Sequence, residues 1–184
     1  GFAPDGGWEE GLTYWNYGTR YLALADRMGL VVWAEMPSAY RPGPTASARL
    51  LREWADVVVA HRGYPSVVAW VPLNESWGVP DQPSVAAHRD LVQALYHLTH
   101  AIDGTRPVVG NDGWEHLVSD IFGVHDYSAS GDVLRQRYGS TEALQHTLAK
   151  IQPYYKVLML SDPADAEAPR DGVRRGPVVA GQHD

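Results

Sequence analysis

The chain has 184 residues, of which 45% are hydrophobic and 20% charged, and its formal net charge is −7. This length suits one domain with a sizeable core, and an acidic charge without a basic stripe argues against nucleic acid or an anionic membrane as a partner. The chain has no cysteine, which excludes disulfides and thiol chemistry, and no apolar run reaches the ~18 residues of a membrane span.

Segments with helix and strand patterns alternate along the chain. Residues 1–13 are rich in glycine and proline and predict a loop, and residues 14–28 predict a helix that stops at Gly29. A buried strand over residues 30–36 and a helix ending near His61 follow. The later expected elements are a strand over 66–75, a helix from Asp81 or Ser84 to Gly104, strands over 107–109, 120–124 and 177–179, a helix over 141–150 and a mobile loop over 161–176.

This alternation predicts an α/β fold with about five parallel strands and flanking helices, in one domain over residues 1–184. An open sheet of five strands has two unpaired edges, which favour self-association. No signal segment is evident, which favours a cytoplasmic location, although the first residue, Gly1, is not a methionine.

Asn74-Glu75 is the most informative pair of residues. It follows the run over residues 66–73, which is apolar on both faces and is therefore typical of a buried parallel strand. Core packing gives no reason for a carboxylate at this point, and α/β folds keep their chemistry at the carboxyl ends of strands. The alternative interpretation of Glu75 is a helix N-cap or a solvated loop acid.

Polar or aromatic side chains also follow the other expected strands, and right-handed crossovers would bring them to one face. Trp and Tyr combine an apolar face with a polar group, which suits the binding of a sugar. Alternatives remain open: Glu35 as a structural acceptor, His125 as a brace for Glu75 or a rim histidine, and the tryptophans as core. The candidate substrate-binding residues are Glu35, Asn74, Trp77, Asn111, Asp112, Trp114, His125 and Tyr127.

Two pairs of residues have the spacing of metal ligands on a helix. His97 and His100 are three positions apart, and Asp112 and His116 are four apart. Neither pair has a third ligand at a suitable spacing, so we expect no metal site.

Four blocks of the sequence resemble the catalytic domain of glycoside hydrolase family 2, a family that includes β-galactosidases, β-glucuronidases and β-mannosidases. The blocks are residues 20–40, 64–78, 111–115 and 123–127, within a resemblance that covers residues 17–179. The block around Asn74-Glu75 is the most specific. Because the family's domain is a (β/α)8 TIM barrel, the resemblance implies that this chain is a partial TIM barrel.

The resemblance implies hydrolysis of O-glycosidic bonds in β-glycosides by a retaining mechanism, with a carbohydrate substrate and no cofactor. Such hydrolysis needs one carboxyl that protonates the leaving oxygen and another that attacks the anomeric carbon. Glu75 matches the acid/base, and Asn74 matches the residue that binds the sugar 2-hydroxyl. The position that matches the nucleophile is Gln182, whose amide does not attack as a carboxylate does. The alternative function is therefore a carbohydrate-binding or assembly remnant without catalysis.

Overall fold

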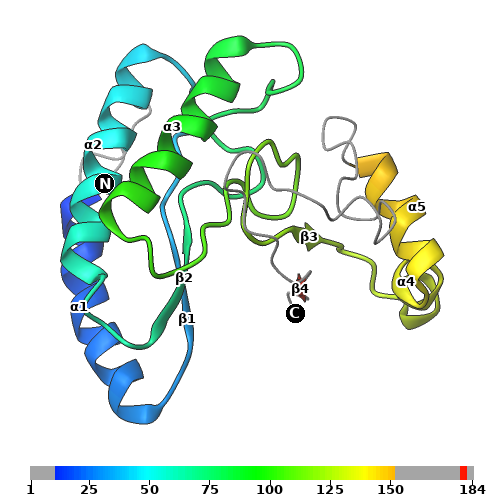
Figure 1. Cartoon of the computed structure of the whole chain (residues 1–184), viewed down its shortest axis with the longest axis horizontal. Helices are drawn as coiled ribbons and strands as arrows, with labels where there is room; N and C mark the ends of the chain where they lie inside the picture. Colours follow the sequence, from blue (N-terminus) through cyan, green and yellow to red (C-terminus); the bar gives the residue numbers. More distant parts are fainter. Residues whose placement is uncertain (1–10, 152–178, 182–184) are drawn as a thin grey trace, which may run out of the picture.

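A computed structural model describes residues 11–151 and 179–181 (Figure 1). None of the helices in these two ranges is long and apolar enough to cross a membrane. The elements, in chain order, are α1 (Gly11–Met28), β1 (Val32–Glu35), α2 (Pro44–His61), β2 (Val67–Val71), α3 (Ala86–Ile102), β3 (Gly123–His125), α4 (Gly131–Tyr138), α5 (Thr141–Ile151) and β4 (Val179–Gly181).

The described strands form two parallel pairs. β1 pairs with β2, and β3 pairs with β4. Residues 107–112 lie along the other edge of β2, where the backbone of Trp70 donates to the Pro107 carbonyl at 3.0 Å and accepts from the Val109 amide at 2.8 Å. The α/β fold predicted from the sequence, a partial barrel of parallel strands with flanking helices, is confirmed.

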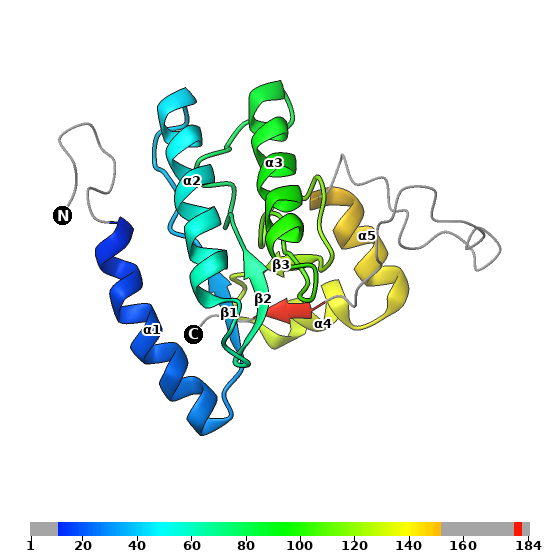
Figure 2. The same cartoon turned by 60° about the vertical axis from the view of Figure 1, so that its left-hand side comes forward.

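Two helices cover one face of β1 and β2. α2 and α3 lie side by side in both views (Figures 1 and 2). Their buried apolar side chains belong to the same core cluster as those of β2. Helical spacing brings these side chains together, because it puts residues three or four apart on one face. The buried residues of α2 and α3 are Leu50, Trp54, Val57, Val58, His61, Leu91, Val92, Leu95, Tyr96 and Thr99.

Two tryptophans form the centre of this core. Trp54 of α2 and Trp70 of β2 are completely buried and meet edge to face, with ring centroids 5.9 Å apart. Each indole N–H has a partner, because Trp54 Nε1 donates to Thr99 Oγ1 at 2.7 Å and Trp70 Nε1 donates to Asp103 Oδ2 at 3.0 Å. Burial alone would raise the pKa of Asp103, but hydrogen bonds from Thr105, Trp70 and Arg106 hold it below its usual range. Both indole N–H groups at the centre of the described core are therefore hydrogen-bonded, as buried tryptophans usually are.

α4 and α5 lie beyond β3, away from α2 and α3 (Figure 1). A second apolar cluster, formed by Phe122, Val124 and Leu148, packs α5 against β3. Asp126, just after β3, accepts two hydrogen bonds from Arg137 Nη1, at 2.7 and 2.8 Å. The Tyr138 hydroxyl also donates to Asp126, at 2.8 Å. Because Arg137 and Tyr138 both belong to α4, these hydrogen bonds connect the end of β3 to that helix.

Several element boundaries differ from those expected. α1 begins at Gly11 rather than at residue 14, because the first turn of a helix has free N–H groups and tolerates glycine. The stretch 107–112 pairs with β2 through isolated bridges and is too irregular to count as a strand. α4 was not predicted because none of its residues, all of them described, is buried; a Ser130 side-chain cap begins it. Residues 1–10 and the loop expected over 161–176 lie outside the described residues.

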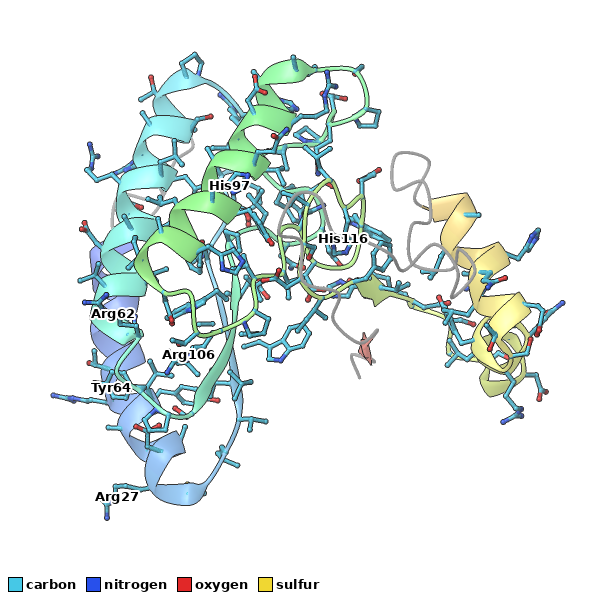
Figure 3. All side chains as sticks on the ribbon, viewed as in Figure 1. Arg27, Arg62, Tyr64, His97, Arg106 and His116 are labelled. Atoms are coloured by element: carbon cyan, nitrogen blue, oxygen red, sulfur yellow. The ribbon has the colours of Figure 1, made fainter. Side chains whose placement is uncertain are left out.

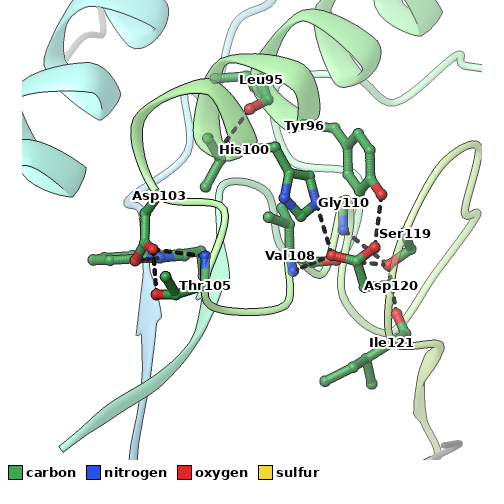
Figure 4. A network of polar contacts seen from close by, with 12 residues as sticks. Leu95, Tyr96, His100, Asp103, Thr105, Val108, Gly110, Ser119, Asp120 and Ile121 are labelled. Carbon is green, nitrogen blue, oxygen red and sulfur yellow. Dashed lines mark hydrogen bonds and ion pairs between the residues drawn. The ribbon is translucent and has the colours of Figure 1, made fainter. Parts of the chain in front are cut away.

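The fourth expected strand, over 120–124, begins only at Gly123 because Asp120 has another role (Figure 4). Its carboxylate accepts hydrogen bonds from the Val108 amide at 2.8 Å and from the Tyr96 hydroxyl at 2.7 Å. His100 Nε2 lies 2.8 Å from the same carboxylate. Asp120 thus joins α3 to the start of residues 107–112 instead of continuing a strand.

Candidate active site

The backbone after β2 is held against residues 111–113. The Glu75 amide donates to the Asp112 carbonyl at 2.8 Å, and the Asp112 amide donates to the Leu73 carbonyl at 2.9 Å. Both bonds lie past the regular part of β2, so Glu75 sits at the carboxyl end of the strand and next to Asp112. The backbone of Glu75 has a φ of 50° and that of Ser76 a φ of 58°, both in the left-handed region.

The Glu75 carboxyl has two partners from the chain after β3. Its Oε1 lies 2.7 Å from His125 Nδ1, and the Tyr127 hydroxyl donates to the same oxygen. The Glu75 side chain is 18% exposed and that of His125 is 9% exposed, so this contact is largely shielded from water. The hydrogen bond to Glu75 raises the pKa of Tyr127, because ionising the phenol would place two negative charges together.

His125 lies between two carboxylates. Its Nε2 is 3.5 Å from Asp112 Oδ2, on the opposite side of the ring from Glu75. Two glycines allow this close packing. A Cβ on Gly123 would lie 1.7 Å from Asp112 Oδ1, and a Cβ on Gly113 would lie 2.4 Å from the His125 ring. The arrangement Glu75–His125–Asp112 therefore depends on having glycine at both of these positions.

The Trp114 ring lies near both partners of this carboxyl, His125 and Tyr127. Trp114 and Tyr127 are both exposed, and their ring centroids are 6.4 Å apart. Trp77, two residues after Glu75, is also exposed and meets Tyr40 edge to face at 5.3 Å. Apolar ring faces and a partly shielded carboxylate are thus brought together, which is an arrangement suited to a sugar.

The remaining expected site residues differ in their surroundings. Asn74 Oδ1 is buried and has no hydrogen-bond partner among the described residues. Glu35 is exposed at the end of β1, opposite Val71. Asn111 is completely buried, with its amide directed at the backbone turn after Glu75. Gln182 lies outside the described residues; the preceding residue, Gly181, is paired with His125.

Three residues near the site were missed from the sequence. Ser76, Gln82 and Glu115 form hydrogen bonds with one another and with Asn111. The only signal for them was the position of Ser76 directly after Glu75. Nothing in the sequence indicates that Glu115 meets Ser76, because the contact joins two different loops. Gln82 lies in the same loop as Ser76, six residues on, at a spacing that belongs to no regular structure.

Members of both residue pairs considered as metal ligands, His97 with His100 and Asp112 with His116, have other partners. Figure 3 shows His97 on α3 and His116 in the segment that precedes β3. The His116 ring stacks on Phe122 with centroids 4.3 Å apart, and Nε2 donates to the Gly123 carbonyl at 2.9 Å. His100 contacts Asp120. In the described part of the chain, no group of three His, Asp or Glu side chains is placed to hold a metal ion.

Comparison with known proteins places the chain among glycosidase domains. Residues 13–159 match the family model described as "Glycosyl hydrolases family 2, TIM barrel domain". No curated protein matches at a significant level.

Three solved structures illustrate the likeness. The β-glucuronidase of Parabacteroides merdae is 22% identical with a TM-score of 0.53, covering 68% of this chain and 17% of that one. A β-glucuronidase of an uncultured Clostridium sp. is 17% identical with a TM-score of 0.52, covering 72% of this chain and 26% of that one. β-Glucuronidase 3 of Bacteroides uniformis is 25% identical with a TM-score of 0.49, covering 58% of this chain and 14% of that one. The first two likenesses support the fold, and this chain spans only a small part of each protein's length.

Proposed function

The chain belongs to family 2 of the glycosyl hydrolases, and from that membership we propose that its domain hydrolyses O-glycosidic bonds in β-glycosides, with Glu75 as general acid and base. The observation that carries the proposal is the Glu75 carboxyl at the end of β2, between His125 and Tyr127. A carboxyl at a strand end with hydrogen-bonding partners is the group that this chemistry needs.

Two steps follow from a retaining mechanism. In the first, Glu75 gives its proton to the glycosidic oxygen while a second carboxylate forms a bond to the anomeric carbon and the leaving group departs. In the second, Glu75 takes a proton from water as that water displaces the enzyme carboxylate, which restores both groups. Glu75 must therefore exchange a proton twice in each cycle.

His125 and Asp112 support this exchange in the proposal. A carboxylate on the Nε2 side favours the ring tautomer that carries its proton on Nε2. Nδ1 then faces Glu75 as an acceptor, and accepts a hydrogen bond from the protonated carboxyl. Tyr127 donates to the same carboxyl oxygen and stabilises the charged form between the two steps.

The substrate in this proposal is a carbohydrate. The buried, unpartnered Asn74 Oδ1 is available to accept a hydrogen bond from a sugar hydroxyl, the 2-hydroxyl by resemblance to the family. Trp77, Trp114 and Tyr127 offer exposed rings for stacking, and Glu35, exposed at the end of β1, would line the subsite in this proposal.

A second candidate is carbohydrate binding without turnover. The observation that favours it is Gln182, an amide at the position where the family carries its nucleophile. A neutral amide does not form the glycosyl–enzyme bond of the first step. The same aromatic residues would then bind sugar, and Glu75 would serve only as a hydrogen-bond partner.

Hydrolysis of 4-nitrophenyl β-glycosides by the full chain tests the first candidate. We expect Glu75→Gln to lower any turnover by about 10²- to 10⁴-fold, the usual contribution of a general acid or base. Glu53→Gln, which changes a surface carboxyl paired with Arg49 on α2, is the control and should leave the rate unchanged. Hydrolysis that persists in Glu75→Gln would refute the assignment. Quenching of Trp emission by oligosaccharide without turnover would instead support the second candidate.

A further inference from the structure

Two consecutive residues with side chains adopt left-handed backbone conformations where β2 leads into its loop. The φ values of Glu75 and Ser76 are 50° and 58°, in a region that residues other than glycine rarely occupy. Such conformations persist only where the surrounding structure holds them, and they cluster at functional sites. The contacts that hold this turn therefore bear on how Glu75 is aimed.

Asn111 makes the most direct of these contacts. It is completely buried, and its Oδ1 accepts a hydrogen bond from the Ser76 amide at 2.9 Å. Its Nδ2 donates to Ser76 Oγ at 3.0 Å and to the Glu115 carbonyl at 2.7 Å. One amide group thus binds both the backbone and the side chain of the residue after Glu75.

Ser76 joins the turn to a second loop. Its hydroxyl donates to Glu115 Oε2 at 2.7 Å, and Gln82 Nε2 lies 3.4 Å from the same hydroxyl. Asn111 and Glu115 both belong to the segment after residues 107–110, which runs beside β2. The turn that carries Glu75 is consequently fixed to the neighbouring strand end through side chains as well as through the Glu75 amide.

We infer that Asn111, acting with Ser76 and Glu115, is a positioning residue that holds the Glu75–Ser76 turn in its left-handed conformation and so aims the Glu75 carboxyl at His125 and Tyr127. This inference rests on the proposed role of Glu75 as acid and base. Asn111 acts through the backbone, since its amide is buried and already bonded to the turn. If φ at Glu75 relaxed to a negative value, its Cβ would point elsewhere and the 2.7 Å contact with His125 would be lost.

The test reads the conformation of the turn in the isotopically labelled full chain by NMR, without substrate. A positive φ brings the amide and α hydrogens of one residue close together and gives a strong intraresidue NOE. We expect this NOE at Glu75 and Ser76 in the native chain. In Asn111→Ala we expect it to be lost, together with a shift of the His125 Nδ1 resonance.

The matched control is Thr99→Ala. Thr99 is also completely buried and also bonds a side chain and a backbone carbonyl, those of Trp54 and Leu95, but it lies in the core between α2 and α3. Both variants should lower the melting temperature, while only Asn111→Ala should change the signals of Glu75 and His125. If Asn111→Ala folds with these signals intact, Asn111 is an ordinary structural residue and the inference is overturned.

A second variant covers the case in which Asn111→Ala does not fold. Asn111→Ser keeps a small polar side chain at this buried position but is too short to reach the Ser76 amide that Asn111 Oδ1 binds. Loss of the Glu75 NOE in this variant supports the inference, and its retention overturns it.

The inference and the proposed function fail in different ways. Changed NMR signals without hydrolysis by any form of the chain would leave the positioning role standing and refute catalysis. Where hydrolysis is observed, Asn111→Ala should lower kcat by about 10²-fold, as misplacement of a reacting group does, with KM changed less than about twofold. A rise in KM with kcat intact would show that Asn111 binds substrate instead.

Discussion

Stability should depend on pH through His116, which is almost completely buried behind the site. Burial is the main cause that lowers its pKa from 6.5 to about 4, and the hydrogen bond to the Gly123 carbonyl opposes it. The folded protein therefore takes up a proton at His116 less readily than the unfolded chain. The stability that comes from the neutral ring is fully present above pH 6.5 and is lost as the pH falls towards 4.

The size of the effect follows from the shift. At about 1.4 kcal/mol per pKa unit, the fall in the His116 pKa from 6.5 to about 4 contributes about 3 kcal/mol to the unfolding free energy at neutral pH. About 2 kcal/mol of this contribution is lost by pH 5. His116→Phe keeps a ring against Phe122 and removes the titrating group. The difference in unfolding free energy between pH 7 and pH 5 should shrink by about 2 kcal/mol in this variant.

Urea unfolding at the two pH values measures this difference. Burial also lowers the pKa of His61, so the native chain and His116→Phe share that contribution and it cancels in the comparison. His97→Gln, at an exposed histidine on α3, is the control and should keep the native pH dependence. If the native chain and His116→Phe lost the same unfolding free energy between pH 7 and pH 5, the reasoning would be refuted.

Three further predictions concern the core and the site. Thr99→Ala leaves the buried Trp54 indole N–H without its partner and should cost about 1–3 kcal/mol of unfolding free energy in urea, while Thr99→Ser keeps the hydroxyl and should cost less. Gly123→Ala places a Cβ against Asp112 Oδ1 and should displace the Asp112 side chain. We expect a shift of the His125 Nε2 resonance and a loss of about 1–3 kcal/mol of unfolding free energy. An unshifted resonance would contradict the packing described. Glu75→Gln weakens the hydrogen bond that raises the pKa of Tyr127 and also removes the nearby charge, so this phenol should ionise at lower pH in an ultraviolet titration. Tyr127→Phe identifies its signal, and an unchanged midpoint would count against the contact.

The parts of the structure that follow from local pattern could be predicted from the sequence. The doubly apolar run before Asn74-Glu75 indicated β2 and the strand end that carries a carboxylate, and helical spacing indicated the buried face of α2 with Leu50 and Trp54. α4 escaped prediction because it has no apolar stripe. The start of β3 was misplaced because Asp120 binds Val108 across the sheet, a contact that no local pattern reports.

The positioning role that we infer for Asn111 could not be predicted from the sequence, for a physical reason. Its amide binds the turn because Glu75 and Ser76 have positive φ, which is not expected of residues with side chains. A strand-end asparagine beside Asp112 is indistinguishable, in sequence, from one that contacts substrate. Its burial and its hydrogen bond to the Ser76 amide are the observations that favour the positioning role.

The role of Glu75 as acid and base can be tested most directly with Glu75→Ala, made in a Gln182→Glu background that supplies the carboxylate the first step requires. With a 2,4-dinitrophenyl β-glycoside, whose leaving group needs no protonation, the second step should be slow, and added azide should take the place of the activated water. The proposed role predicts that azide raises the turnover and gives the β-glycosyl azide. An α-glycosyl azide, or turnover that azide does not change, would contradict it.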